Sequence, residues 1–340
     1  MTARLKRAAR TLGLVLLGFL MLAATGWGVL ALLYWDHADS LLRKCLACAY
    51  GGASLVLLVG FLQARWRARA LGAFAAFLSL LVIAWCTLAP SNDRDWEPEN
   101  AMLASASITG TRITLHNIRN FDYRTETDFT PAYYDRTFDL QQLNAVDLFA
   151  VYWMGPAIAH VFVSFGFTDD SHVAVSIEAR RERGEGYSAL RGFFRQYELY
   201  YAVGDERDLV RLRTNYRHMP PEQVYLYRLQ GSRENGQRLF LEYVHELNAL
   251  KERPEWYNAL TSNCTSNIWL HSRVNPGHLH YSWKILLSGY LPELLYERGK
   301  LDGSVPFATL QRRAHINARA QAADQARDFS ERIRAAEPPP

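Results

Sequence analysis

The residue of this chain best suited to covalent chemistry is Cys264, in the stretch Thr261-Ser262-Asn263-Cys264-Thr265. Thr, Ser and Asn are common helix N-cap residues, and an apolar face begins at Ile268. We predict that a helix starts at or beside Cys264, where backbone N–H groups and the helix dipole lower the pKa of the thiol. The alternative is an unreactive cysteine packed in the core. Because its neighbours are polar, we favour a nucleophile, with Asn263 and Thr265 supporting the oxyanion.

A cysteine nucleophile requires a base, usually a histidine that a third polar group orients. Two histidines lie on a predicted β-hairpin, whose arms are residues 160–167 and 172–178 and whose turn is 168–171. This register puts His160 at the open end, opposite Ala179. It puts His172 at the turn, roughly 20–25 Å along the strand. We therefore expect His160 to be the base and keep His172 as the alternative, although capping the hairpin suits His172 better.

Glu178 is the expected third group of the site, and Arg180 is a further supporting residue. A four-residue turn points Glu178 to the opposite face from His160, whereas a turn one residue longer or shorter brings them together. The competing interpretation of Glu178 is an ion pair with Arg180 or Arg181. The H-x-H pair His278 and His280 is a weak metal signal on its own, and we expect no metal and no cofactor.

Three apolar segments precede the soluble part of the chain, at residues 12–34, 45–62 and 71–88. About 20 apolar residues are enough for a helix to span a bilayer, so residues 1–90 are predicted to be a membrane anchor. Four basic residues precede the first segment, and Arg65, Arg67 and Arg69 separate the second from the third. The positive-inside rule then puts the chain after residue 88 outside the cell membrane, although Arg43 and Lys44 lie on the less favoured side.

The net charge of +4 does not indicate a nucleic-acid binder. Residues 1–90 carry nine basic and two acidic residues, which is +7, so the rest of the chain carries 4 − 7 = −3. The basic residues therefore belong to the anchor, and the soluble part has no basic footprint for nucleic acid. The chain contains four cysteines, and Cys264 is the one that lies in the soluble part, so that part has no internal disulfide.

Residues 91–314 are predicted to form one soluble domain, followed by a solvated, fraying tail at 315–340. Strands are expected near 108–115, 148–153 and 224–229, and helices over 187–203 and 232–251. Such an irregular mixture is typical of an α+β domain. The histidine precedes the cysteine, which is the reverse of the papain order. It is the order of circularly permuted members of the papain-like class, so we expect an α+β papain-like cysteine-enzyme domain of that permuted type.

Four motifs follow one another in the soluble part: Trp153-x-Gly155-Pro156-Ala157-x-Ala159-His160-x-Phe162-x-Ser164-Phe165-x-Phe167, Ser176-Ile177-Glu178-x-Arg180, Asp205-Glu206-Arg207-Asp208 and Asn263-Cys264-Thr265. Together they resemble the Lnb N-terminal periplasmic domain family, over roughly residues 92–275. The family's namesake is a lipoprotein N-acylating enzyme that carries an acyl chain as a thioester on a Cys–His pair. The resemblance implies that Cys264 is the acylated nucleophile and His160 the base. Three membrane segments precede the domain here, and the namesake's substrate does not follow from the resemblance alone.

We therefore expect a membrane-bound thiol acyl enzyme in the bacterial inner membrane, with its soluble domain in the periplasm. It would act as an acyltransferase on lipoproteins or other lipid-linked envelope substrates, through a thioester on Cys264. Its expected partners are the lipid bilayer and that substrate. The alternatives are a cysteine peptidase or amidase of envelope substrates, and a non-catalytic assembly protein. An interfacial patch or acyl groove is expected from an apolar set of residues: Trp283, Ile285, Leu286, Leu287 and Leu291.

Overall fold

The computed structural model describes residues 3–35 and 39–335 and divides the chain into two compact units. The first unit comprises residues 1–90 together with 188–196, and the second comprises 91–187 and 197–340.

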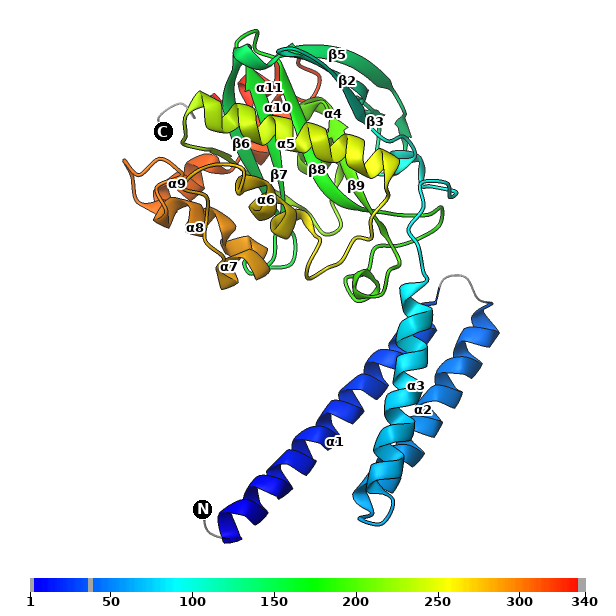
Figure 1. Ribbon diagram of the computed structural model, residues 1–340. Helices are drawn as coiled ribbons and strands as arrows, with labels where there is room; N and C mark the ends of the chain where they lie inside the picture. The colour runs from blue at the N-terminus through cyan, green and yellow to red at the C-terminus, as the bar shows by residue number, and fades with distance from the viewer. Residues whose placement is uncertain (1–2, 36–38, 336–340) are drawn as a thin grey trace. The chain divides into compact units, whose positions relative to one another are not determined.

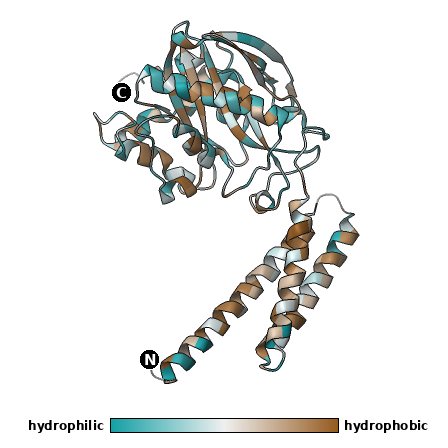
Figure 2. Ribbon diagram, in the orientation of Figure 1, coloured by the Kyte–Doolittle hydropathy of each residue, from teal (hydrophilic) through white to brown (hydrophobic). Residues whose placement is uncertain are grey.

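Three apolar helices form most of the first unit: α1 (Ala3–Leu33), α2 (Ser40–Leu62) and α3 (Arg67–Cys86). Each is long and apolar enough to cross a bilayer, and brown dominates them in Figure 2. They confirm the three predicted spans. Each begins four to nine residues earlier than predicted, because the flanking basic segments continue the helix. A Cβ at Gly28 would overlap Tyr50 and Leu81, so this glycine lets the three helices pack closely.

The segment 188–196 belongs to the first unit rather than to a helix of the soluble domain. It holds one 3₁₀ turn (Arg191–Phe193), and its Phe194 ring lies 6.3 Å from the ring of Trp85. Strand β9 (Glu198–Gly204) follows it. The helix predicted over 187–203 is therefore wrong. The Leu-Tyr-Tyr-Ala-Val run is buried on both faces of the sheet, where aromatic and β-branched residues favour a strand.

An eight-stranded mixed sheet forms the centre of the second unit. Its order is β1-β2-β9-β8-β7-β6-β10, with β5 paired to β2. The β2–β9 contact is parallel and the other pairs are antiparallel. The strands are β1 (Ser105–Thr109), β2 (Arg112–Arg119), β5 (Tyr133–Asp139), β6 (Leu143–Tyr152), β7 (His160–Phe167), β8 (His172–Arg180), β9 and β10 (Gln223–Arg228). A separate pair is formed by β3 (Asp122–Tyr123) and β4 (Phe129–Thr130).

Helices cover both faces of this sheet (Figure 1). On one face, α5 (Arg233–Glu252), α6 (Cys264–Ser272) and α8 (Leu291–Glu297) enclose a core to which β7 contributes Val161 and Phe165. On the other face, α4 (Glu206–Arg211), α10 (Asn317–Ala322) and α11 (Phe329–Arg332) pack against Phe162. The short helices α7 (Trp283–Leu286) and α9 (Phe307–Ala314) complete the unit. The chain is thus a membrane-anchored protein with a mixed α/β domain.

The segment after residue 314 packs against the sheet instead of being solvated as expected. Ile316, Phe329 and Ile333 are each 0% exposed, and they lie in the core on the α4 face. Residues 336–340 of the predicted tail lie outside the described residues. The second unit therefore uses the last described part of the chain to cover one face of its sheet.

Candidate active site

The β7–β8 hairpin is present as predicted, but its turn is one residue shorter. Gly166 pairs with His172, which leaves residues 168–170 as the loop, and Asp170 has a φ of 60°. A three-residue hairpin loop that ends in a left-handed residue is a common alternative to two- and four-residue loops. The predicted register, with Phe167 opposite His172, is therefore wrong by one residue.

This shift brings Glu178 to the same sheet face as His160, because side chains alternate along a strand. His160 Nε2 lies 2.7 Å from the hydroxyl of Ser176, and that hydroxyl donates to Glu178 Oε1 at 2.8 Å. The direct His160 Nε2–Glu178 Oε1 distance is 3.6 Å. Because the Ser176 proton goes to Glu178, the hydroxyl accepts from Nε2–H. The lone pair of the imidazole is then on Nδ1, and this unprotonated nitrogen is the one that can accept a proton when His160 acts as a base.

Two guanidinium groups near the site set the charges of this pair. Arg213, on the π-helical turn Leu212–Tyr216, donates to Glu178 Oε1 at 2.9 Å. Burial would raise the pKa of Glu178, but Arg213, His160 and Arg217 outweigh it and hold that pKa well below its usual range. Burial, with help from Arg213, lowers the pKa of His160 to about 3. At neutral pH the site therefore holds a neutral imidazole beside a carboxylate.

Helix α6 begins at Cys264, as the sequence predicts, with a complete capping box. The side-chain oxygen of Asn263 accepts from the backbone N–H groups of Thr265 and Ser266 at 3.0 and 2.9 Å, and the Ser266 hydroxyl accepts from the backbone N–H of Asn263. The Asn263 side-chain N–H₂ donates to Ala259. The amide oxygen thus serves the cap, and one of the two side-chain N–H groups is bound to the Ala259 carbonyl.

The thiol of Cys264 lies beside the end of β7 that is no longer paired with β8. The β7–β8 ladder ends at the pair Val163–Val175, although β7 continues along β6 to His160. In the part of β7 beyond the ladder, the backbone N–H of Val161 interacts with the sulfur, and the Thr265 hydroxyl lies 3.7 Å from it. The negative charge of Glu178 also acts on the thiol. The fold thus brings Cys264, His160 and Glu178 together at the unpaired ends of β7 and β8.

The pKa of the Cys264 thiol is raised, which corrects the lowering that we expected from its place at a helix N-terminus. Burial raises it and outweighs the Val161 N–H and the Thr265 hydroxyl, both of which lower it. The dipole effect is weakened because Asn263 already occupies the N–H groups of Thr265 and Ser266. The resting site therefore holds a neutral thiol and a neutral imidazole rather than an ion pair.

We accordingly expect iodoacetamide to modify Cys264 slowly at pH 7. The rate should rise with pH through a midpoint above the free-thiol value of about 8.5, because the thiolate forms only above the raised pKa. The measurement is the alkylation rate against pH, read at Cys264 by peptide mass spectrometry. A midpoint below 8.5 would show that a thiolate–imidazolium pair exists at rest.

Two other predicted site residues lie elsewhere. His172 Nδ1 lies 3.0 Å from the Asp170 carbonyl at the hairpin turn, so His172 caps the turn and is remote from the thiol. The Arg180 guanidinium donates to the carbonyls of Asn100 and Ala101 and stacks on Trp96 at 4.0 Å. Arg180 thus holds the N-terminal linker, and neither it nor Arg181 pairs with Glu178 among the described contacts.

Sequence reasoning missed three side chains around the site. Ser176 was visible in the motif Ser176-x-Glu178, whose two-residue spacing puts both side chains on one face of a strand. Arg213 had no local signal, since it comes from a distant helical turn. Tyr257 was also missed; it is 8% exposed, and its hydroxyl lies 3.3 Å from that of Tyr187. Burial, together with the charge of Cys264, raises the pKa of Tyr257, so its phenol stays protonated beside the thiol.

An exposed apolar surface adjoins the strand that carries His160. Trp283 is 55% exposed, Leu286 46% and Leu287 39%, whereas Ile285 and Leu291 are 2% exposed and belong to the core. The predicted patch is thus real for three of its five residues. The loop before His160 joins this surface: the Gly289 N–H donates to the Ala157 carbonyl at 3.0 Å, and the Ala159 N–H donates to the Ser288 hydroxyl at 2.9 Å.

Comparison with known proteins gives one family. Residues 129–289 match the model of the Lnb N-terminal periplasmic domain, which confirms the resemblance read from the motifs. The matched segment contains His160, Glu178 and Cys264. No curated protein and no solved structure matches the chain. Together with the apolar helices, the match identifies a membrane-anchored protein with a periplasmic domain.

Proposed function

We propose that this protein is a membrane-anchored thiol acyl enzyme that transfers acyl chains to or from lipoproteins or other lipid-linked envelope substrates. One observation carries the proposal. Cys264 begins a helix beside the peptide that follows His160, while the imidazole Nε2 contacts the Ser176 hydroxyl, which in turn donates to Glu178. A helix-borne thiol and a strand-borne histidine with a third polar group make up a papain-like arrangement of groups.

The proposed reaction begins with two neutral partners. His160 Nδ1 takes the thiol proton as the Cys264 sulfur attacks the carbonyl carbon of an ester. The tetrahedral intermediate collapses as the imidazolium returns the proton to the leaving oxygen. An alcohol departs, and the acyl group remains as a thioester on Cys264. In the second half an amine attacks the thioester, His160 accepts its proton, and the sulfur leaves and is reprotonated. Glu178 stabilises the imidazolium that forms in each half, and this is why a depressed resting pKa of His160 is tolerable.

The developing oxyanion needs hydrogen-bond donors. The backbone N–H of Cys264 is the first of α6 and donates to no described residue, as expected for the first turn of a helix. The Thr265 hydroxyl, 2% exposed as a residue and next to the sulfur, is a second donor. We assign the oxyanion to these two groups.

The lipid character of the substrate rests on two features. Four residues separate the end of α3 at Cys86 from the start of the second unit at Ser91, so the chain tethers this domain close to a bilayer. The exposed apolar surface of Trp283, Leu286 and Leu287 borders the loop that leads to His160. An acyl chain near the thiol would find apolar contacts there.

The test is to trap the acyl group on the full chain in membranes. Cells would be fed an alkyne-tagged fatty acid, with Cys45, Cys48 and Cys86 replaced by alanine, because these three free cysteines of the apolar helices would otherwise contribute labelled thioesters. We expect a label at Cys264 that hydroxylamine removes, a hydroxylamine-resistant oxyester in Cys264→Ser, and no label in Cys264→Ala.

Absence of a hydroxylamine-sensitive label at Cys264 would contradict the acyl-enzyme proposal. Covalent capture of Cys264 by a peptide chloromethylketone in the absence of acyl label would instead support the peptidase alternative, which uses the same two residues. A cysteine that reacts with neither probe would favour a non-catalytic assembly protein.

A further inference from the structure

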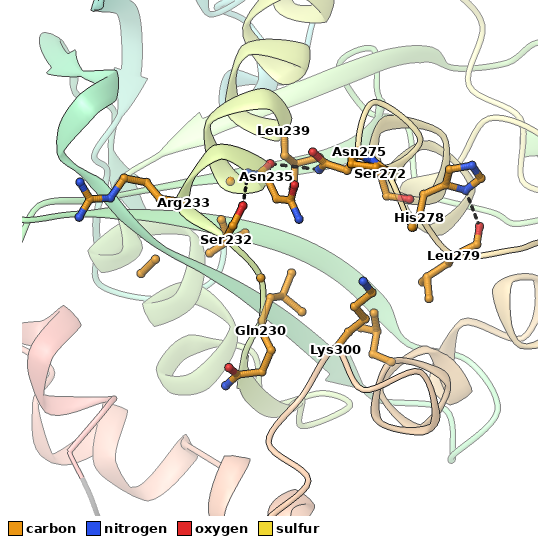
Figure 3. A pocket seen from close by; sticks show the side chains of 18 of the residues that line it. Gln230, Ser232, Arg233, Asn235, Leu239, Ser272, Asn275, His278, Leu279 and Lys300 are labelled. Carbon is orange, nitrogen blue, oxygen red and sulfur yellow. Dashed lines mark hydrogen bonds between the residues drawn. The ribbon is translucent and has the colours of Figure 1, made fainter.

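A cavity of about 390 Å³ opens in the second unit at the far end of α6 from Cys264. Figure 3 shows it between the start of α5, the loop that follows α6 and the residue Lys300. Ser272, the last residue of α6, lines it. Eight residues of helical rise, about 12 Å, separate Ser272 from the thiol. The cavity is therefore a place distinct from the candidate active site.

The polar wall of this cavity is basic. The described residues that line it include Arg233, His278 and Lys300 and no aspartate or glutamate. Lys300 is half-buried, and its ammonium makes no ion pair or hydrogen bond with any described residue. In Figure 3 this side chain extends toward the space between Asn235 and His278. A half-buried cation without a counter-charge favours an anion beside it.

Helix α5 adds to this positive potential. It is 20 residues long, with Ser232 as its N-cap, and residues Gly231, Ser232 and Arg233 line the cavity. The Asn235 N–H is occupied by the cap. The positive end of the helix dipole still faces the same space, and helix N-termini stabilise bound anions.

Part of the cavity wall is apolar. It consists of leucine and valine side chains from β6, α5, α8 and two loops: Leu143, Val146, Leu229, Leu239, Leu279 and Leu295. A cavity of this size with an apolar floor and a few convergent polar groups is typical of a small-molecule site. The apolar floor would gain little from an inorganic anion, and the lysine would gain little from a hydrocarbon.

We propose that this cavity binds an anionic amphiphile, with its phosphate or carboxylate group at Lys300 and the start of α5 and its apolar chain on the leucine floor. The site does not depend on the chemistry of Cys264. It would give the domain a second point of contact with lipid-derived molecules, whether or not the thiol forms a thioester.

The test uses the full chain with Cys264→Ala, in nanodiscs of zwitterionic lipid. The sequence contains five lysines: Lys6, Lys44, Lys251, Lys284 and Lys300. Reductive ¹³C-dimethylation, which keeps their charge, gives each an NMR signal. We expect decyl phosphate to shift the Lys300 signal saturably. The Lys251 signal should not move, because Lys251 lies at the other end of α5.

Variants keep the test independent of the label. Lys300→Gln removes the cation, and Asn144→Trp fills the mouth of the cavity from an exposed position. Each should weaken decyl phosphate binding at least tenfold, measured by ³¹P NMR against empty nanodiscs, whereas Lys251→Gln should not. Binding that both cavity variants leave unchanged would overturn the proposal.

Three further probes separate the sources of the ligand chemistry. Saturation by decyl phosphate, decanoate or both supports the site and shows whether it prefers phosphate or carboxylate. Inorganic phosphate that binds as tightly as decyl phosphate would overturn the proposal, because the floor would then contribute nothing. Decanol that binds as tightly would overturn it too, because the charge of Lys300 would then be irrelevant.

Discussion

Alanine at His160 is expected to slow formation of the acyl-thioester on Cys264 by a factor of about 10²–10⁴, the usual contribution of a positioned general base. The effect should be large because the pKa of the Cys264 thiol is raised, so little thiolate forms without a base. The measurement is the single-turnover rate of alkyne-acyl labelling in membranes. His172→Ala is the matched control, since His172 is bound to the hairpin turn, and its rate should stay unchanged.

The pH dependence of the same rate distinguishes a catalytic from a structural role for His160. Because the pKa of His160 is lowered to about 3, the imidazole stays neutral and competent as the pH falls from 7 to 5. No acidic limb is therefore expected in that range. A limb near 6.5, the ordinary histidine value, would show that a more solvated state of the site is the working one. Equal rates in wild type and His160→Ala would remove His160 from the mechanism.

Replacing Arg334 with methionine is expected to lower the free energy of unfolding of the second unit by about 3–5 kcal/mol, the cost of breaking a buried ion pair from one side. Arg334 contacts two carboxylates that are each 0% exposed, Glu206 at 2.6 Å and Asp147 at 2.7 Å. Asp147 keeps Arg228 as a partner. Among the described residues, Glu206 would keep only the hydroxyl of Ser164 as a side-chain partner. Urea unfolding of the full chain, followed by near-ultraviolet circular dichroism, measures the loss.

The control for this variant is Arg332→Met, two residues away. Arg332 pairs with Asp328, and both side chains are about half exposed, so the change should cost less than about 0.5 kcal/mol. The two variants should also differ in pH dependence. Burial raises the pKa of Glu206, but Arg334 outweighs it and lowers that pKa to about 2. The stabilisation is therefore complete above the unfolded value of about 4.3 and is lost as the pH falls toward 2. Arg334→Met should remove this slope, and a loss independent of pH would contradict the ion-pair explanation.

The acidic motif Asp205-Glu206-Arg207-Asp208 illustrates what such a network does in the fold. Asp205 caps α4, Glu206 binds Arg334, and Asp208 accepts from Arg119 at 2.7 and 3.0 Å. None of these groups faces the thiol among the described contacts. This motif thus resembles a catalytic cluster in composition, yet it holds helix α4 to the sheet and to the last described residues of the chain.

Much of the fold could be predicted because local signals were strong. The apolar spans, the hairpin arms and helix α5 follow from composition and period alone. The strand at 198–204 could not be distinguished from a helix, because a strand buried on both faces has no alternation. The packing of Ile316, Phe329 and Ile333 also has no local signal. A few apolar residues in a polar, alanine-rich segment become core residues only when a sheet face is available for them to pack against.

The candidate site could be predicted in part. Cys264 followed from cap residues, and His160 followed from its place at the end of the hairpin. The neutral state of the Cys264 thiol and the His160 imidazole could not be predicted from the sequence. It follows from the burial of both groups, from the occupied helix cap and from the approach of Arg213, and each of these depends on tertiary contacts. The same holds for the partner of Glu178, which is Arg213 rather than the neighbouring Arg180 or Arg181.

The three-residue turn of the hairpin decides which face of the sheet each side chain of β8 points to. One residue more or fewer at this tip, some 20 Å from the sulfur, would exchange the two faces of β8 and turn the carboxylate of Glu178 away from the imidazole. A change of two residues would preserve the arrangement. The number of residues in an exposed loop usually varies among related proteins, but in this turn it is constrained by the position of Glu178. Related chains that keep the acid should keep an odd number of residues in this turn.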